Sequence, residues 1–299
     1  MKIVFFGNTK YSVFDLKALY EKFGLSLVVT IPDRPSGRKR EIKPSPVKQF
    51  AKDHNIPVLQ TDKLDQSSVE QVANIQPDFL IVADYGLILP ESLLEIPRFA
   101  PLNVHHSLLP KYRGPSPAPT AILNGEKVSG VTIISMTEQV DAGDMLEQQK
   151  YELKPDETTD SLLTELNQLG GQLVCKVIKD YIKGNENPIP QDDKQATYTK
   201  RFTKQDGLIN MENPPDPGTL NRMVRAFYPW PTVWSKWKME NGKWKIFKFL
   251  PPTILPAHNP TDPFTIQPEG KRPMSISEFK NGYPEIFSRI LLLTPRFSL

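Results

Sequence analysis

Asparagine and histidine are two positions apart in the segment LNVHHSLLPKYRG, residues 102–114. Side chains of an extended segment alternate between its two faces, so Asn103 and His105 can share one pocket while His106 faces the opposite side. Asp141 follows the apolar run GVTIISM, in the segment VDAGDML. An amide N–H and a protonated imidazole can stabilise an oxyanion, and a carboxylate can raise the histidine pKa and assist proton removal. These residue types predict attack of a nucleophile on a carbonyl-like carbon.

A covalent intermediate on the protein is not indicated. Ser107 lacks the glycine pattern of a nucleophile elbow, so direct transfer between two bound substrates is favoured. Gly7 is followed by NTKYS, without the further glycines of a dinucleotide-binding fingerprint, and is interpreted as a tight turn. The single cysteine excludes a disulfide framework and a thiolate metal cluster. The alternative for His105 is a structural hydrogen bond to a nearby acid.

A sheet is expected to position these residues. The runs KIVFFG, LSLVVTI, DFLIVAD, LNVHHS and GVTIISM have the pattern of buried strands and alternate with helix-like segments, including a helix over 159–183. The alternation predicts a parallel sheet covered by helices on both faces, with ligands beyond the carboxyl ends of its strands. Asn103, His105 and Asp141 fall at two such ends, and they meet in one cleft if those strands are neighbours.

The pattern changes after NENPIPQDD, residues 185–193, whose composition is typical of a linker. TVWSKWKM and KWKIFKF alternate basic residues with aromatic and aliphatic ones, which predicts β-hairpins. We therefore expect a small β-barrel as the second domain.

Basic residues are unevenly distributed in a chain of net charge +3. Residues 196–299 contain 15 basic and 8 acidic residues, a net of +7, and residues 32–48 contain six basic and two acidic ones. Two basic regions indicate a polyanionic partner such as nucleic acid; the alternative is a solvated basic loop. The first apolar run is too short for a signal peptide or a membrane span, so a cytoplasmic location is expected.

Several of these segments together resemble the methionyl-tRNA formyltransferase family. SLLPKYRG and VDAGDML are typical of folate-dependent formyltransferases, PDRPSGR with PSPVK is typical of the tRNA enzymes, and MKIVFFGN, ADYGLILP, RAFYPWP and IQPEGKRPMS extend the match over most of the chain. The resemblance implies an α/β fold, with a Rossmann-like N-terminal domain around a parallel-rich sheet and a small OB-like C-terminal β-barrel. It implies transfer of the formyl group of 10-formyltetrahydrofolate to the amino group of methionyl-initiator tRNA, without a metal and by a monomer.

Site residues are carried over from the resemblance by position. Asn103, His105 and Asp141 match the catalytic trio. The co-substrate would contact Ser107, Leu108, Leu109 and Pro110, the backbone of Tyr85, Gly86, Leu87, Ile88 and Leu89, and the turn that contains Val140 and Ala142. Phosphate contacts to tRNA would come from Arg34, Arg38, Lys39, Arg40 and Lys43.

The expected domains are a catalytic domain over 1–187, a linker over 188–206 and a shortened OB-like domain over 207–299. KFLPPTILPAHNPTDPFTIQPEGK contains six prolines where the family usually has a longer, glycine-rich strand pair. Proline removes ladder hydrogen bonds from central strands, so the barrel is predicted to be truncated.

Two other functions stay open at this point. An amino-sugar-nucleotide N-formyltransferase would share the trio and the SLLP segment but would not need the basic loop or the basic C-terminal third. A catalytically idle tRNA-binding homologue would keep the basic regions, and the intact trio argues against it.

Overall fold

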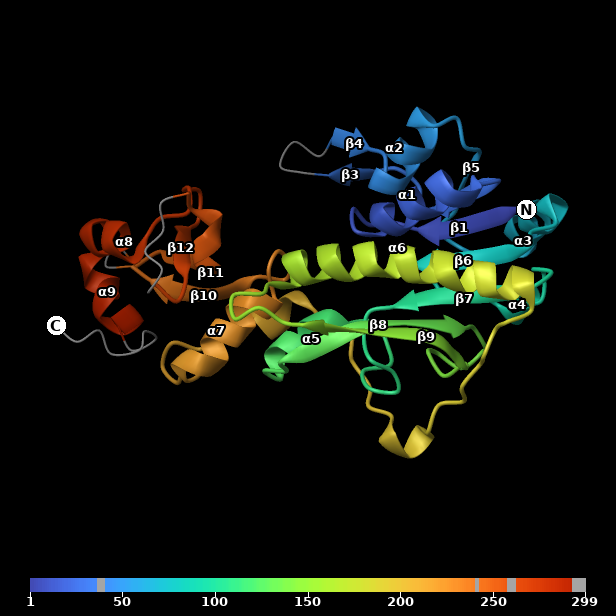
Figure 1. Cartoon of the computed structure of the whole chain (residues 1–299). Helices are drawn as coiled ribbons and strands as arrows, with labels where there is room; N and C mark the ends of the chain where they lie inside the picture. Colours follow the sequence, from blue (N-terminus) through green and yellow to red (C-terminus); the bar gives the residue numbers. More distant parts are fainter. Residues whose placement is uncertain (37–40, 240–241, 257–261, 292–299) are drawn as a thin grey trace. The chain divides into compact units, whose positions relative to one another are not determined.

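We describe a computed structural model of the chain for residues 1–36, 41–239, 242–256 and 262–291 (Figure 1). Its largest sheet joins seven strands of the described residues in the order β5-β2-β1-β6-β7-β8-β9. Neighbouring strands from β5 to β7 are parallel, and β8 and β9 are antiparallel to their neighbours. The strands are β1 (Ile3–Gly7), β2 (Leu27–Thr30), β5 (Val58–Gln60), β6 (Phe79–Ala83), β7 (Ala100–His105), β8 (Val128–Ser135) and β9 (Met145–Glu152).

The centre of this sheet is apolar on both faces, as a parallel sheet covered by helices requires. Every residue of β1 and β6 is buried. On one face, Val4 and Leu80 belong to a core cluster that includes Val72 of α3 (Gln66–Ile75) and Leu93 of α4 (Glu91–Leu94). In β7, Asn103 pairs with Val82 of the same cluster, so the Asn103 side chain points to this face.

Helix α6 (Thr159–Lys183), predicted over these residues, packs on the opposite face of the sheet (Figure 1). A Cβ atom at Gly170 would lie 2.5 Å from Val104 Cγ1, and one at Gly171 would lie 2.9 Å from Cβ of Ala18 in α1 (Ser12–Phe23). These two glycines therefore allow α6 to approach both β7 and α1 closely.

The predicted strands and the parallel-rich sheet are confirmed, but the sheet continues beyond the predicted strands. β8 runs antiparallel to β7, with His105 opposite Thr132, and β9 pairs with β8. β9 was not predicted, because its sequence MLEQQKYE lacks a buried-strand pattern. It is the edge strand, and its residues are half-buried or exposed.

The basic segment predicted as a loop contains a hairpin of β3 (Arg34–Ser36) and β4 (Glu41–Lys43). At its base, Lys48 Nζ donates hydrogen bonds to both carboxylate oxygens of Asp33, at 2.8 and 2.7 Å, and to Gln60 Oε1 at 2.6 Å. Lys48 belongs to α2 (Pro46–Asp53). This lysine of the PSPVK segment therefore braces the hairpin and is not available for phosphate contacts.

The chain divides into two compact units. The first comprises residues 1–117, 128–152 and 163–199, and the second comprises 118–127, 153–162 and 200–299. The domain boundaries expected at 187 and 207 stay a prediction. No helix among the described residues combines the length and the apolar character needed to cross a membrane.

The second unit contains a three-stranded antiparallel sheet in the order β10-β11-β12. Phe247 and Phe249 of β11 are buried and Lys248 between them is exposed, so the aromatic alternation forms the hairpin that the sequence predicts. Within the described residues, this sheet is consistent with a small, shortened barrel. The elements of this unit are α5 (Pro117–Leu123), α7 (Pro217–Ala226), β10 (Val233–Lys238), β11 (Trp244–Leu250), β12 (Thr265–Pro268), α8 (Ile276–Gly282) and α9 (Pro284–Leu291), with short 3-10 helices at Lys204–Gly207 and Pro252–Ile254. A further 3-10 helix, Asp193–Gln195, belongs to the first unit.

Candidate active site

Asn103, His105 and Asp141 lie together in the first unit. Asn103 Nδ2 donates a hydrogen bond to Asp141 Oδ1 at 3.2 Å, and His105 Nδ1 lies 3.5 Å from the same oxygen. The side chains of His105 and Asp141 are only 6% and 11% exposed. Removal from water strengthens the attraction between a carboxylate and a protonated imidazole at these positions. The three side chains thus form one cluster of an amide, an imidazole and a carboxylate.

The imidazole of His105 lies between two acceptor oxygens. Its Nε2 is 3.0 Å from the carbonyl oxygen of Tyr112, and its Nδ1 faces Asp141. A ring that carries a proton on each nitrogen can donate to both partners. Sequence reasoning missed Tyr112, because a backbone carbonyl acts here and has no residue-type signal.

The turn between β8 and β9 presents the carboxylate. Asp141 Oδ2 accepts a hydrogen bond from the backbone N–H of Gly114 at 2.7 Å, and Asp141 has a left-handed φ of 54°. A Cβ atom at Gly143 would lie 1.7 Å from the carbonyl oxygen of Ser135, so this position accepts only glycine. Gly114 is a further contact that the sequence did not reveal.

The topology corrects one step of the prediction. The two strands are neighbours, as required, but β8 is antiparallel to β7, and Ser135 at its carboxyl end pairs with Leu102. The carboxyl ends of β7 and β8 therefore do not lie side by side. Asp141 reaches Asn103 and His105 because the turn over residues 136–143 folds back, with Ser135 N donating to Asp144 O at 3.0 Å.

The segment 107–110 is fixed by hydrogen bonds within the unit. Ser107 Oγ donates to the carbonyl oxygen of Lys111 at 2.6 Å, and Ser107 O accepts from Thr132 Oγ1 at 2.7 Å. Thr132 Oγ1 also accepts from Leu109 N at 3.2 Å. The Ser107 hydroxyl and the Leu109 side chain are thus engaged inside the protein. The other two residues of the segment are half-buried, namely Leu108 and Pro110.

The segment 85–89 turns its residues in two directions. Tyr85 and Leu89 are buried in the core cluster of the sheet, and burial raises the pKa of Tyr85 to about 12. Ile88 is 75% exposed, Gly86 is exposed and Leu87 is half-buried against the cluster. Only part of this segment can therefore meet a ligand through its side chains.

The two residues that flank Asp141 are accessible: Val140 is 52% exposed and Ala142 is half-buried. They place apolar surface beside the buried carboxylate of the trio. This is compatible with the contacts to an aromatic co-substrate expected there.

Two of the five residues expected to contact tRNA can be placed. Arg34 and Lys43 are paired across the β3–β4 hairpin, and both are exposed. Lys43 Nζ lies 3.6 Å from the exposed carboxylate of Glu41, an interaction that contributes little. The other three lie outside the described residues: Arg38, Lys39 and Arg40.

A buried polar cluster lies behind the trio, on the face of β7 that α6 covers. His106 Nδ1 lies 3.5 Å from Asp84 Oδ1, and Asp84 Oδ2 accepts from Thr9 Oγ1 at 3.0 Å. Burial lowers the pKa of His106 and, together with Asp84, raises the pKa of Asp15 well above its usual value. Both Asp15 carboxyl oxygens and His106 Nε2 lack a partner among the described residues. His106 thus faces away from the trio, as predicted.

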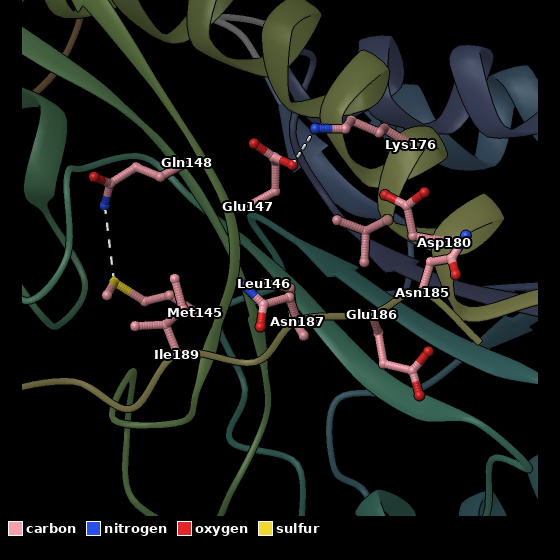
Figure 2. Close-up of a pocket in the computed structure, with 11 residues that line it drawn as sticks. Met145, Leu146, Glu147, Gln148, Lys176, Asp180, Asn185, Glu186, Asn187 and Ile189 are labelled. Atoms are coloured by element: carbon pink, nitrogen blue, oxygen red, sulfur yellow. Dashed lines mark hydrogen bonds and ion pairs between the residues drawn. The ribbon is translucent and has the colours of Figure 1, made fainter. Parts of the chain in front are cut away.

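A pocket of about 420 Å³ lies beside edge strand β9 and contains none of the trio (Figure 2). Figure 2 shows Glu147 of β9 in an ion pair with Lys176 of α6, next to Asp180. Gln148 of the same strand donates hydrogen bonds to Leu109 O at 3.1 Å and to Thr132 Oγ1 at 2.9 Å. β9 therefore supports the segment 107–110 from the side of this pocket.

Comparisons with known proteins agree with this architecture. Residues 1–178 match the family described as formyl transferase. A methionyl-tRNA formyltransferase from Halalkalibacterium halodurans is 42% identical over 245 residues, which is 81% of this chain and 76% of that protein. One from Listeria innocua is 36% identical over 301 residues, covering 94% and 95% of the two chains.

Solved structures share the fold at lower identity. A sugar N-formyltransferase from Shewanella superimposes with a TM-score of 0.61 and 16% identity, covering 82% of this chain and 95% of that one. HypX from Aquifex aeolicus, solved in complex with tetrahydrofolic acid, gives a TM-score of 0.58 and 19% identity over 84% of this chain and 37% of its own. The match to the formyl transferase family and the identity to full-length relatives show that this chain belongs to the methionyl-tRNA formyltransferase family.

Proposed function

We propose that this protein transfers the formyl group of 10-formyltetrahydrofolate to the amino group of methionyl-initiator tRNA. The observation that carries the proposal is the cluster of Asn103, His105 and Asp141, with both candidate donors within 3.5 Å of one carboxylate oxygen. Family membership supports the reaction class and the acceptor.

In the proposed reaction, the neutral methionyl amine attacks the formyl carbon, and the oxygen of the formyl group becomes an oxyanion. Asn103 Nδ2 has one N–H on Asp141, and its second N–H has no partner among the described residues and can donate to that oxyanion. Both N–H groups of a protonated His105 face acceptors of the protein, namely Tyr112 O and Asp141, so this imidazolium stabilises the oxyanion by its positive charge. The bond from the formyl carbon to the folate nitrogen then breaks, and tetrahydrofolate leaves.

Asp141 has two roles in this proposal. Its carboxylate faces His105 Nδ1 and so stabilises the imidazolium at the moment when that ring faces the oxyanion. It also accepts the proton lost by the attacking amine, directly or through a water, and the proton is delivered to the departing folate nitrogen. Its second oxygen is held by Gly114 N at 2.7 Å, which fixes the direction of the carboxylate.

The folate co-substrate is assigned to the surfaces around the trio. The segment 107–110 supplies a fixed wall, since Ser107 and Leu109 are tied to Thr132. Ile88 and Val140 supply exposed apolar surface, suited to the flat pterin ring. Burial of apolar surface drives the binding of such rings, and a few backbone groups set their orientation.

The tRNA is assigned to the basic hairpin. Arg34 and Lys43 are paired across β3 and β4, so two cations face a common partner. Arg38, Lys39 and Arg40 belong to the same segment of sequence and are assigned to the same role. Phosphate contacts of this kind give sequence-tolerant, salt-dependent affinity.

The test is a choice of acceptor. The purified protein is incubated with 10-formyltetrahydrofolate and either methionyl-initiator tRNA or an amino sugar nucleotide, and formylated product is quantified. We expect transfer to the tRNA, with the amino sugar nucleotide at background. Transfer to the sugar alone would replace the proposed acceptor, and tRNA binding without any transfer would show an idle homologue.

A further inference from the structure

Gln191 makes four hydrogen bonds, two to the turn that carries Asp141 and two to the side chain of Arg113. Its Nε2 donates to the carbonyl oxygens of Asp141 at 2.9 Å and of Gly143 at 2.7 Å. Its Oε1 accepts from Arg113 Nε at 3.0 Å and from Arg113 Nη2 at 2.9 Å. A glutamine amide has two N–H groups and two acceptor lone pairs, so these bonds use its full capacity and fix its orientation.

Arg113 is held just as firmly. Its side chain is 3% exposed, and Nη2 also donates to Asp193 Oδ1 at 2.7 Å. Its backbone N–H donates to Thr197 O, and its carbonyl oxygen accepts from Thr199 N, both at 2.8 Å. A buried guanidinium with these partners is a rigid anchor, because breaking any contact would leave a buried charge under-solvated.

Arg113 lies between the two backbone groups that touch the trio. Tyr112, on one side, offers its carbonyl oxygen to His105, and Gly114, on the other, donates its N–H to Asp141. The segment 191–199, which lies within the linker expected over 188–206, is therefore bound along the segment 110–116. It contacts the turn over 141–143 through Gln191.

The turn has a reason to need such support. Asp141 is a non-glycine residue with a left-handed φ of 54°, a conformation that persists when neighbouring structure over-determines it. Its side chain must meet Asn103 and His105 together, so a rotation of the backbone at Asp141 would withdraw the carboxylate from both. Gln191 binds the two carbonyls on either side of Ala142 and restrains this rotation.

We propose that Gln191 is a positioning residue for formyl transfer: it locks the turn over 141–143 so that the Asp141 carboxylate faces Asn103 and His105, and Arg113 sets the orientation of its amide. The role rests on the proposed function, since it acts through Asp141. Gln191 itself touches neither substrate in this account.

The test uses Gln191→Glu, in which the carboxylate keeps the size of the side chain and the contact with Arg113 but cannot donate to either carbonyl. We expect kcat to fall at least tenfold, with the KM for 10-formyltetrahydrofolate within twofold of that of the wild type. Gln195→Glu is the matched control: it lies in the same segment, is exposed, and donates only to Asp192 among the described residues. It should keep wild-type kcat. Gln191→Met, without a charge, provides the same test if the glutamate variant does not fold.

A double-mutant cycle separates positioning from a general structural effect. In an Asp141→Asn background, Gln191→Glu should lower the residual rate by less than twofold, because the group that it positions is already disabled. The inference would be overturned if Gln191→Glu lowered the rate by the same factor in the Asp141→Asn background as in the wild type. A Gln191 variant with wild-type kcat would also overturn it.

Hydrogen exchange followed by mass spectrometry gives a readout that needs no acceptor. Amides of residues 139–145 should exchange at least fivefold faster in the Gln191 variant than in the wild type or in Gln195→Glu. If the wild type formylates no acceptor, the proposed function fails, whereas the exchange measurement still decides whether Gln191 locks the turn. Equal exchange in wild type and variant would contradict the lock.

Discussion

Two backbone groups complete the trio of side chains: the carbonyl oxygen of Tyr112 contacts His105, and the N–H of Gly114 donates to Asp141. The spacing of Asn103 and His105 indicated a shared face, and Asp141 stood out as a carboxylate after an apolar run. Tyr112 and Gly114 act through a carbonyl and an N–H, which every residue carries, so no sequence pattern could single them out. Gln191 has a side-chain role, but its partners are backbone carbonyls 48 and 50 residues away.

Asp15 gives a prediction for stability against pH. Its pKa is raised well above the usual value, first by burial and then by Asp84. The folded state therefore holds this proton more tightly than the unfolded state. The resulting contribution to stability is complete below the unfolded pKa of about 3.9 and is lost as the pH rises through the folded pKa.

Asp15→Asn removes this dependence, because an amide does not titrate. The free energy of unfolding is measured by urea denaturation at pH 5 and at pH 8. Its decrease between the two pH values should be smaller in the variant than in the wild type. The difference should be about 1.4 kcal/mol for each pH unit over which the carboxyl is protonated in the folded state and ionised in the unfolded state. Asp53→Asn, on the exposed end of α2, serves as the control. Parallel pH curves for wild type and Asp15→Asn would refute a protonated Asp15.

Among the elements, periodicity located most strands and helices but not their direction. The buried runs of β1, β6 and β7 and the full length of α6 followed from apolar pattern alone. β8 runs antiparallel to β7, a direction that an apolar run does not encode, and the 136–143 turn joins β8 to β9 as an antiparallel pair. β9 is a half-buried or exposed edge strand and has little apolar signal. The three residues of the trio were expected at the carboxyl ends of two neighbouring strands. Asp141 instead reaches Asn103 and His105 because the 136–143 turn folds back.

The β3–β4 hairpin carries a prediction about salt dependence. Replacing Arg34 and Lys43 together by glutamine should weaken tRNA binding, and the slope of log K against log salt should fall by up to about 2, because each lost phosphate contact removes about 0.7–0.9 from it. The measurement is filter binding of initiator tRNA at several salt concentrations. Lys17→Gln with Lys63→Gln, two exposed lysines of the same unit outside the hairpin, controls for net charge. Equal slopes for the two double variants would remove the hairpin from tRNA binding.

In the whole molecule, the two units have different characters. Most of the acidic residues belong to the first 195 residues, whereas the C-terminal third has a net charge of +7. The sequence predicted a shortened barrel from its prolines, and the described part of the second unit has a sheet of three strands. The relative from Listeria innocua matches over 94% of this chain, so the basic second unit belongs to the family architecture.

The trio is the central claim, and single-turnover formyl transfer by Asp141→Asn tests it most directly. The amide keeps an acceptor for Gly114 N, so the turn should stay folded, and binding of a tetrahydrofolate analogue should stay within twofold of wild type. Asp144→Asn, directly after the turn over 136–143, is the matched control. We predict that Asp141→Asn lowers the rate of transfer to methionyl-tRNA at least about a hundredfold, the range of general acid–base catalysis, while Asp144→Asn retains most of it. A wild-type rate in Asp141→Asn would contradict the account.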